Sequence, residues 1–217
     1  MPMKNSHYKT KYFNWQKKIG MVGGKINADK FARYINPNDV VLDFGCGGGY
    51  LLGNLSCKKK IGVEINPVAR KEARKNKNLE IHSSIKLLKN GMVDKVISNH
   101  ALEHTKRPID ELVTLQRVLK KTGKIVLVTP IDDYRNNKRY VASDINNHLY
   151  TWNSQLLGNC LKEAGFKNIK IEVLTHAWPP MFYKELYNFL PQKLFDLICW
   201  LIAVALNKRQ LIAVASK

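Results

Sequence analysis

Two carboxylates and a run of glycines have the spacing of a binding site for a nucleoside-like ligand. Asp43 follows the apolar residues Val40–Leu42, glycines recur at every second position from Gly45 to Gly49, and Glu64 lies further along. Glycine tolerates positive φ and lets the backbone approach a ligand closely. A carboxylate such as Glu64 can accept hydrogen bonds from both ribose hydroxyls. The pattern predicts a strand, a glycine turn and a helix N-terminus around one ligand.

The same turn argues against a dinucleotide. The dinucleotide fingerprint is G-x-G-x-x-G/A, and its third position is Tyr50 here. Asp43 at the end of a strand would repel a diphosphate but attract a cation, such as the ammonium group of a methionine moiety. The turn therefore favours S-adenosylmethionine (SAM) as the cofactor.

Three histidines are candidate catalytic bases. SAM carries an already activated methyl group, so an enzyme must align the acceptor and, for a hydroxyl, remove a proton. His100 and His104 follow an expected strand, and His148 precedes an expected helix, which places all three near the carboxyl edge of the sheet. Each also has a structural interpretation, because a single histidine often serves only to orient a loop.

Acidic and aromatic residues after the fifth expected strand could shape the acceptor pocket. They are Asp132, Asp133 and Tyr134. Asp132 and Asp133 could also bind a divalent metal, but no third ligand is evident beside them. The sequence therefore predicts no metal site.

Short apolar runs alternate with helical patterns along most of the chain, as expected for strands covered on both faces. The expected strands are Val40–Asp43, Lys60–Glu64, Leu79–His82, Val93–Ser98, Lys124–Thr129, Ile169–Leu174 and Gln210–Ala215. The expected helices are Ile26–Ile35, Tyr50–Leu55, Pro67–Lys75, Pro108–Leu119 and Asn153–Ala164. This alternation predicts an α/β fold, a doubly wound Rossmann-like sheet that binds its ligand at the carboxyl ends of the strands.

Glycines indicate where helices are interrupted or end. Gly20, Gly23 and Gly24 predict a break before the helix at Ile26, and Gly123 and Gly165 predict helix ends.

Composition is compatible with one domain over residues 1–217, with an N-terminal helical cap over 1–36. The chain has 217 residues, an apolar fraction of 45% and four cysteines, none of them in a Cys-x-x-Cys pair. Scattered cysteines indicate reduced thiols, and the polar N-terminus has no apolar signal core. We therefore expect a cytoplasmic protein, with a membrane association left open. The sequence does not indicate an oligomeric state.

The formal net charge is +19. This charge could serve a polyanionic partner: a nucleic acid, an anionic membrane surface or an acidic glycan. Tyr8, Tyr12, Phe13 and Trp15 lie among the N-terminal lysines and could form a flap over the cofactor or a packed helix. The alternative is a solvated basic surface, because the charges are spread over the whole chain.

An apolar segment interrupts the alternation before the last strand. Residues 177–207 are predicted to be a helical insertion, and the run Leu194–Leu206 is the most apolar part of Met181–Asn207. Its thirteen residues are fewer than the ~20 that a membrane span needs. It could be a lid, a dimer contact, an in-plane membrane contact or part of the core.

The chain resembles the class I SAM-dependent methyltransferases, in the broad group of small-molecule enzymes that includes the ubiquinone-biosynthesis type. The segments that carry the resemblance are Val41–Tyr50, Gly62–Asn66, Val93–His104 (ending in Leu-Glu-His), Leu119–Pro130, and the pair His148–Trp152 and Ala164–Phe166. The resemblance implies a seven-stranded, mostly parallel sheet with helices on both faces and its last strand antiparallel.

The resemblance also implies a set of cofactor-binding residues. They are Asp43, Gly45, Cys46, Gly47, Gly49, Glu64, Ile65, Ser83, Ser84 and Asn99. The family often has an aspartate after the third strand that binds the adenine amino group, whereas this chain has Ser83 and Ser84 there. A serine hydroxyl would bind adenine with less charge assistance.

Three functional hypotheses follow. The leading one is methyl transfer from SAM to a hydroxyl oxygen of a small molecule or glycan. The second is methylation of tRNA, rRNA or another nucleic acid, which the charge favours. The third is a non-catalytic SAM-fold protein at a membrane surface. Apolar pocket walls would favour a lipid or quinone acceptor, and polar walls with basic residues a sugar or acidic glycan.

Overall fold

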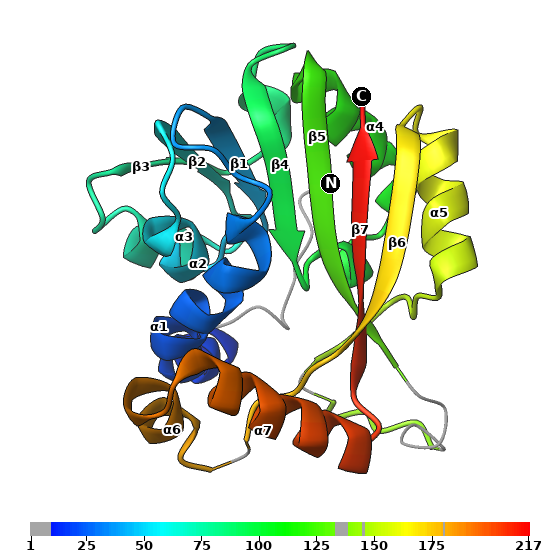
Figure 1. Ribbon diagram of the computed structural model, residues 1–217. Coiled ribbons are helices and arrows are strands. Elements are labelled where there is room, and N and C mark those ends of the chain that lie inside the picture. Colours follow the sequence, from blue (N-terminus) through cyan, green and yellow to red (C-terminus); the bar gives the residue numbers. More distant parts are fainter. Residues whose placement is uncertain (1–9, 133–138, 145, 180) are drawn as a thin grey trace.

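The computed structural model describes residues 10–132, 139–144, 146–179 and 181–217, and within this range it leaves out the side chains of residues 10–16, 18 and 19. Its centre is one sheet of seven strands in the order β3-β2-β1-β4-β5-β7-β6 (Figure 1). The strands are β1 (Val40–Phe44), β2 (Lys59–Val63), β3 (Leu79–His82), β4 (Val93–Asn99), β5 (Leu119–Ile131), β6 (Lys167–Thr175) and β7 (Arg209–Ser216).

The sheet is mostly parallel. Strands β3, β2, β1, β4 and β5 pair in parallel, and β7 pairs antiparallel with both β5 and β6. The predicted doubly wound sheet with an antiparallel last strand is therefore confirmed. Strand order reverses between β1 and β4, and ligands of such sheets bind at the carboxyl ends beside that point.

Helices cover both faces of the sheet. They are α1 (Thr10–Ala32), α2 (Tyr50–Asn54), α3 (Pro67–Ala73), α4 (Pro108–Val118), α5 (Ser154–Glu163), α6 (Tyr183–Phe189) and α7 (Gln192–Ala205), with the short 3-10 helices η1 (Ile85–Leu87) and η2 (Leu102–His104). Leu42 of β1 lies in the core shared with α4 and α5, and its neighbour Val41 in the core shared with α1, α2 and α3. Successive residues of a strand point to opposite faces, so a strand that is covered on both faces buries neighbouring apolar residues such as Val41 and Leu42.

The predicted break in the N-terminal helix is wrong. Helix α1 runs without interruption through Gly20, Gly23 and Gly24. A Cβ atom at Gly24 would lie 2.5 Å from Tyr50 Cβ, and one at Gly23 would lie 2.3 Å from the ring of Trp178. These glycines therefore let α1 pack closely on α2 and on the segment after β6, and tertiary packing outweighs their low helix propensity.

The predicted helix end at Gly123 is also wrong. Helix α4 ends at Val118 and β5 begins at Leu119, so Gly123 lies inside a strand and not at a helix end. Leu119 pairs with Val93 of β4, and the register shifts before the next pairs, which extends β5 at its start. Gly165 does follow a helix end, with a φ of 87°.

The predicted apolar insertion forms two helices, α6 and α7, between β6 and β7. Figure 1 shows them beyond the end of the sheet at which β4 finishes, next to α1. Phe195, Cys199 and Ala203 of α7 are buried, and the first two pack with Ile26 of α1. The side chains on the outer surface of α7 remain exposed, among them Leu197 and Trp200. Core packing thus accounts for one side of α7, while the lid, dimer and membrane interpretations stay predictions.

In the part of the chain that the structure describes, no helix is both long and apolar enough to cross a membrane. The division into one domain with a cap over residues 1–36 also stays a prediction. Tyr8 lies outside the described residues, and the side chains of Tyr12, Phe13 and Trp15 are likewise not described.

Candidate active site

The glycine turn between β1 and α2 forms the cofactor end of the site. Gly45, Gly47 and Gly49 all have positive φ angles, of 78°, 53° and 77°. The backbone N–H groups of Gly45 and Cys46 both donate to the carbonyl of Val63 in β2, at 2.8 and 3.1 Å. A Cβ atom at Gly47 would meet no protein atom within 4 Å. The turn is therefore fixed to the sheet on one side and opens into free space on the other.

Asp43 is the second-last residue of β1, beside this turn, and is 2% exposed. Burial, together with the negative charge of Glu64, raises the pKa of Asp43 to about 7. Asp43 forms no salt bridge with any of the described residues. A buried carboxylate without a cation is unfavourable, so this position suits a ligand that brings a positive charge.

Glu64 follows β2 and holds the turn in place. Its two carboxylate oxygens accept hydrogen bonds from the backbone N–H groups of Gly47 (2.9 Å) and Asn66 (2.7 Å). Burial raises the pKa of Glu64, although these hydrogen bonds oppose the shift. Each carboxylate oxygen has a further lone pair, so Glu64 can still accept from ribose hydroxyls.

A cavity of about 400 Å³ adjoins the turn, and its walls differ in charge from one end to the other. Asp43, Gly45, Cys46 and Gly47 line the cofactor end. The other end is lined by Lys30, His100, His104, His148, His176 and Gln210. Among the described residues that line the cavity, Asp43 is the only carboxylate. The cavity therefore joins an acidic cofactor end to a polar, basic acceptor end.

Lys30 brings a cation from α1 to the acceptor end. Its Nζ donates to Oε1 of Gln210 on β7, at 3.1 Å. Burial lowers the pKa of Lys30 to about 8, so the ammonium form still predominates at neutral pH. The described residues give Lys30 no carboxylate partner.

His100 has a strained backbone. Its φ is 54°, which is rare outside glycine, and its N–H donates to Val128 of β5 at 2.9 Å. Burial and the charge of Lys30 lower the pKa of His100 to about 3. At neutral pH its imidazole is therefore uncharged and faces the cavity.

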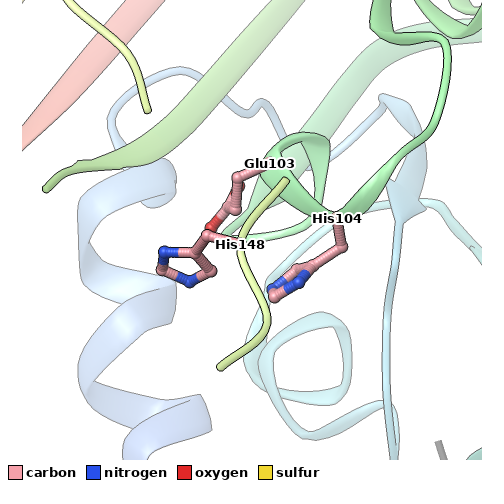
Figure 2. A group of neighbouring side chains, drawn as sticks. All are labelled: Glu103, His104 and His148. Carbon is pink, nitrogen blue, oxygen red and sulfur yellow. The ribbon is translucent and has the colours of Figure 1, made fainter. Parts of the chain in front are cut away.

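Glu103, His104 and His148 converge at the acceptor end (Figure 2). Glu103 and His104 come from η2, and His148 comes from the loop before α5. One ligand atom from each lies within 4.8 Å of the others, and the rings of His104 and His148 meet edge to face, with centroids 5.0 Å apart. Burial raises the pKa of Glu103 to about 7. These groups could hold a metal ion, although the sequence-based expectation had considered only Asp132 and Asp133 as ligands.

Asp132 holds His148 in place. Its Oδ2 lies 2.7 Å from Nδ1 of His148. Burial alone would lower the pKa of His148, but the hydrogen bond and charge of Asp132 raise it above its ordinary value. Asp133 and Tyr134, the other predicted pocket residues, lie outside the described residues.

The structure brings together most of the predicted site. All three predicted catalytic histidines line the cavity, as do Asp43, Gly45, Cys46, Gly47 and Asn99. Gly49 instead is the N-cap residue of α2, Glu64 lies behind the turn, and Ser84 accepts a hydrogen bond from the Lys86 N–H at the start of η1. Ile65 and Ser83 are exposed outside the lining. The roles assigned to all these residues stay predictions.

Sequence reasoning missed Lys30, His176 and Gln210. Lys30 lies one helical turn after Ile26, on the predicted apolar side of its helix, and a lysine there was a detectable signal. His176 follows β6, at the strand end where ligands bind. Gln210 had no signal, because it contacts Lys30 across 180 residues of sequence.

The fold and the glycine site define a class I SAM-dependent methyltransferase. Residues 25–171 match the family described as a methyltransferase domain, and the chain belongs to that family. The predicted enzyme class and the predicted cofactor, SAM, are confirmed, which argues against the non-catalytic hypothesis. The narrower small-molecule subgroup stays a prediction.

Known proteins support this assignment. A tRNA U34 carboxymethyltransferase of Shewanella baltica is 30% identical over 161 residues, which cover 65% of this chain and 48% of the relative. The chain thus spans about half the length of the curated relatives it matches.

Two solved structures share the fold. A SAM-dependent methyltransferase of Thermotoga maritima, described as a possible histamine N-methyltransferase, has a TM-score of 0.69 at 17% identity, covering 97% of this chain and 99% of that one. A SAM-dependent methyltransferase of Archaeoglobus fulgidus has a TM-score of 0.64 at 22% identity, covering 95% and 99%.

Proposed function

We propose that the protein transfers the methyl group of SAM to a hydroxyl oxygen of a small molecule or glycan that carries an anionic group. The observation that carries this proposal is the acceptor end of the cavity, whose walls are polar and basic. Lys30 is partly buried there, and the described residues give it no carboxylate partner. An apolar acceptor such as a lipid or quinone would leave that ammonium group unpaired, whereas an acidic sugar would neutralise it.

Each end of the cavity has its own task in this reaction. Asp43 pairs with the SAM ammonium group, and Glu64 accepts hydrogen bonds from the ribose. Lys30 orients the acceptor so that its hydroxyl oxygen lines up with the methyl carbon. The oxygen attacks that carbon, the carbon–sulfur bond breaks, S-adenosylhomocysteine leaves, and the hydroxyl proton passes to solvent. Alignment of the two reactants supplies much of the rate enhancement in such a transfer.

The cover of the cavity favours a small acceptor. Helix α1 closes one side through Gly20, Gly23 and Gly24, and the ring of Trp178 packs directly against Gly23. The volume of about 400 Å³ lies in the usual range for a small-molecule site. A nucleic acid would have to insert a single extruded nucleotide into this space.

Nucleic-acid methylation is the second candidate. The relative that is 30% identical is named a tRNA U34 carboxymethyltransferase, and the net charge of +19 suits a polyanion. On this alternative Lys30 would bind a phosphate of the RNA.

A transfer assay with SAM that carries a labelled methyl group separates the two. The acceptors are uronic acids and other acidic sugars, their neutral counterparts, hydroxylated aromatic acids, and unmodified tRNA. We expect labelling of an acidic hydroxyl compound and a preference over its neutral counterpart. Labelling of tRNA alone, with an affinity that falls steeply as salt rises, would overturn the proposal in favour of the second candidate.

A further inference from the structure

The carboxylate of Glu103 is buried without the contacts that a buried carboxylate needs. Its side chain is 0% exposed. Neither of its oxygens has a hydrogen-bond partner among the described residues. Nδ1 of His100 lies 3.5 Å from Oε1, which is an ion-pair contact and too long for a good hydrogen bond. A buried carboxylate is normally paired, hydrogen-bonded or bound to a metal.

Two imidazoles stand next to this carboxylate. The potential ligand atoms of Glu103, His104 and His148 all lie within 4.8 Å of one another. Metal–nitrogen and metal–oxygen bonds of about 2.0–2.2 Å place neighbouring ligand atoms roughly 3–4 Å apart, so small side-chain rotations would close this set around one ion. Figure 2 shows the three side chains approaching one another from η2 and from the loop before α5.

Asp132 adds a second, independent feature of a metal site. Its carboxylate lies 2.7 Å from Nδ1 of His148. That contact makes Nδ1 the donor nitrogen and leaves Nε2 with a free lone pair. Histidines that bind metals commonly direct their other nitrogen to a carboxylate in this way.

We propose that Glu103, His104 and His148 form a binding site for one divalent transition-metal ion, such as Zn²⁺ or Mn²⁺. Two imidazoles and one carboxylate suit these ions better than Mg²⁺ or Ca²⁺, which prefer all-oxygen ligands. Three protein ligands also leave coordination positions open. His104 and His148 line the cavity, so these positions can face the acceptor.

The site would act on the acceptor hydroxyl, and this role rests on the proposed function. A metal ion lowers the pKa of an oxygen bound to it. The acceptor hydroxyl would bind the ion and release its proton to solvent. The oxygen would then form its bond to the methyl carbon as the carbon–sulfur bond of SAM breaks. No oxidant or reductant is needed.

Metal binding can be measured without any acceptor. The protein is freed of metal with a chelator and titrated with Zn²⁺ by calorimetry and with Co²⁺ by visible absorption. The variants are Glu103→Gln, His148→Gln and Asp132→Asn. The matched control is His82→Gln, which changes a histidine that also lies beside a glutamate, 2.6 Å from Glu80 at the edge strand β3.

We expect the wild type and His82→Gln to bind one ion per chain. Glu103→Gln and His148→Gln should lose binding by at least about 100-fold, and Asp132→Asn by about 10- to 100-fold. S-adenosylhomocysteine binding reports whether each variant is folded. If Glu103→Gln or His148→Gln does not fold, the Co²⁺ spectrum of the wild type and the Asp132→Asn titration decide the question.

The proposal is overturned if the wild type binds less than one equivalent, or if the ligand variants bind as tightly as His82→Gln. Methyl transfer that persists in a metal-free wild type would overturn the role in catalysis and leave the proposed function intact. Stoichiometric metal binding with no transfer to any acidic acceptor would support the site and overturn the proposed function.

Discussion

The two ends of the cavity are built by different means. At the cofactor end, one continuous segment, residues 43–51, supplies most of the lining, and backbone hydrogen bonds to Val63 and Glu64 fix its shape. At the acceptor end the lining consists of side chains from α1, η2, the loop before α5, the segment after β6, and β7.

This difference predicts which end of the cavity tolerates substitutions. A backbone turn tolerates few substitutions, because positive φ and close approach require glycine. Side chains that come from separate segments can be exchanged one at a time without disturbing the sheet. We therefore expect the glycine turn to determine cofactor binding and the scattered side chains to determine the choice of acceptor.

The largest expected effect belongs to the cofactor end. Asp43→Asn keeps the shape of the side chain but removes the charge that faces the SAM ammonium group. Loss of one partner of a buried charged pair costs about 2–5 kcal/mol, which corresponds to roughly 30-fold to several thousand-fold in affinity. Calorimetry with SAM measures this loss. Asp94→Asn is the control, because Asp94 pairs with Lys120 away from the cavity and should leave SAM affinity unchanged.

An Asp43→Asn protein that binds SAM within about threefold of the wild type would contradict the charge argument. The cofactor end would then rely on its backbone alone, and the contrast between the two ends would become sharper.

In the absence of cofactor, the free energy of unfolding of wild type and of Asp43→Asn should depend differently on pH. The folded-state pKa of Asp43, about 7, is raised above its ordinary value of 3.8, so the folded chain holds the proton more tightly than the unfolded chain. The Asp43 contribution to stability therefore falls as pH rises from about 4 to about 7 and is constant above. Between pH 5 and pH 8 the free energy of unfolding of Asp43→Asn should rise relative to wild type by roughly 2–3 kcal/mol.

Urea unfolding of both proteins at several pH values measures this difference. Saturating SAM should reduce it, because the ammonium group compensates the buried charge only in the wild type. Two curves that stay parallel from pH 5 to pH 8 would show that Asp43 is ionised at no cost.

Much of the fold could be predicted from the sequence, because its strands are short, mostly apolar and regularly spaced. The errors arose where long-range contacts decide local structure. Gly20, Gly23 and Gly24 look like a helix break, yet they are the contact surface of α1. Gly123 looks like a helix end, yet pairing of Leu119 with β4 starts the strand before it.

For the site, the sequence located groups that lie together in a motif and missed those that only the fold brings together. The glycine turn and the histidines after β4 belong to recognisable segments. Lys30 and Gln210 are 180 residues apart, and only the fold brings Lys30 of α1 next to Gln210 of β7. Glu103 was visible in the Leu-Glu-His segment, but its complete burial was not.

A smaller effect should appear at the acceptor end. Lys30→Met removes the ammonium group and keeps an apolar side chain of similar length. A charge-assisted hydrogen bond contributes about 1.5–3 kcal/mol, so KM for the acidic acceptor should rise roughly 10- to 100-fold, with SAM affinity unchanged. Steady-state kinetics with the acidic acceptor found in the labelling assay measure this change.

Lys25→Met is the matched control, because Lys25 lies on the same helix but faces the ring of Tyr187 outside the cavity. It should leave KM unchanged. Equal losses for acidic and neutral acceptors in Lys30→Met would instead show that Lys30 supports the shape of the pocket, and the acceptor end would then not select by charge.

The smallest effect tests how the two ends are joined. A methyl group added in Gly24→Ala would lie 2.5 and 2.6 Å from the Cβ and carbonyl carbon of Tyr50, where backbone leaves little room to adjust. Overpacking of this kind costs about 1–3 kcal/mol, and the better helix propensity of alanine returns up to about 1 kcal/mol. Gly53→Ala in α2 is the control, because the atom nearest to its added methyl group is in the flexible Asn76 amide, at 3.2 Å.

We expect Gly24→Ala to unfold at lower urea concentration and to weaken both SAM and acceptor binding, since α1 lines both ends. If Gly24→Ala weakened SAM binding alone, α1 would belong to the cofactor end, and the acceptor end would be independent of it.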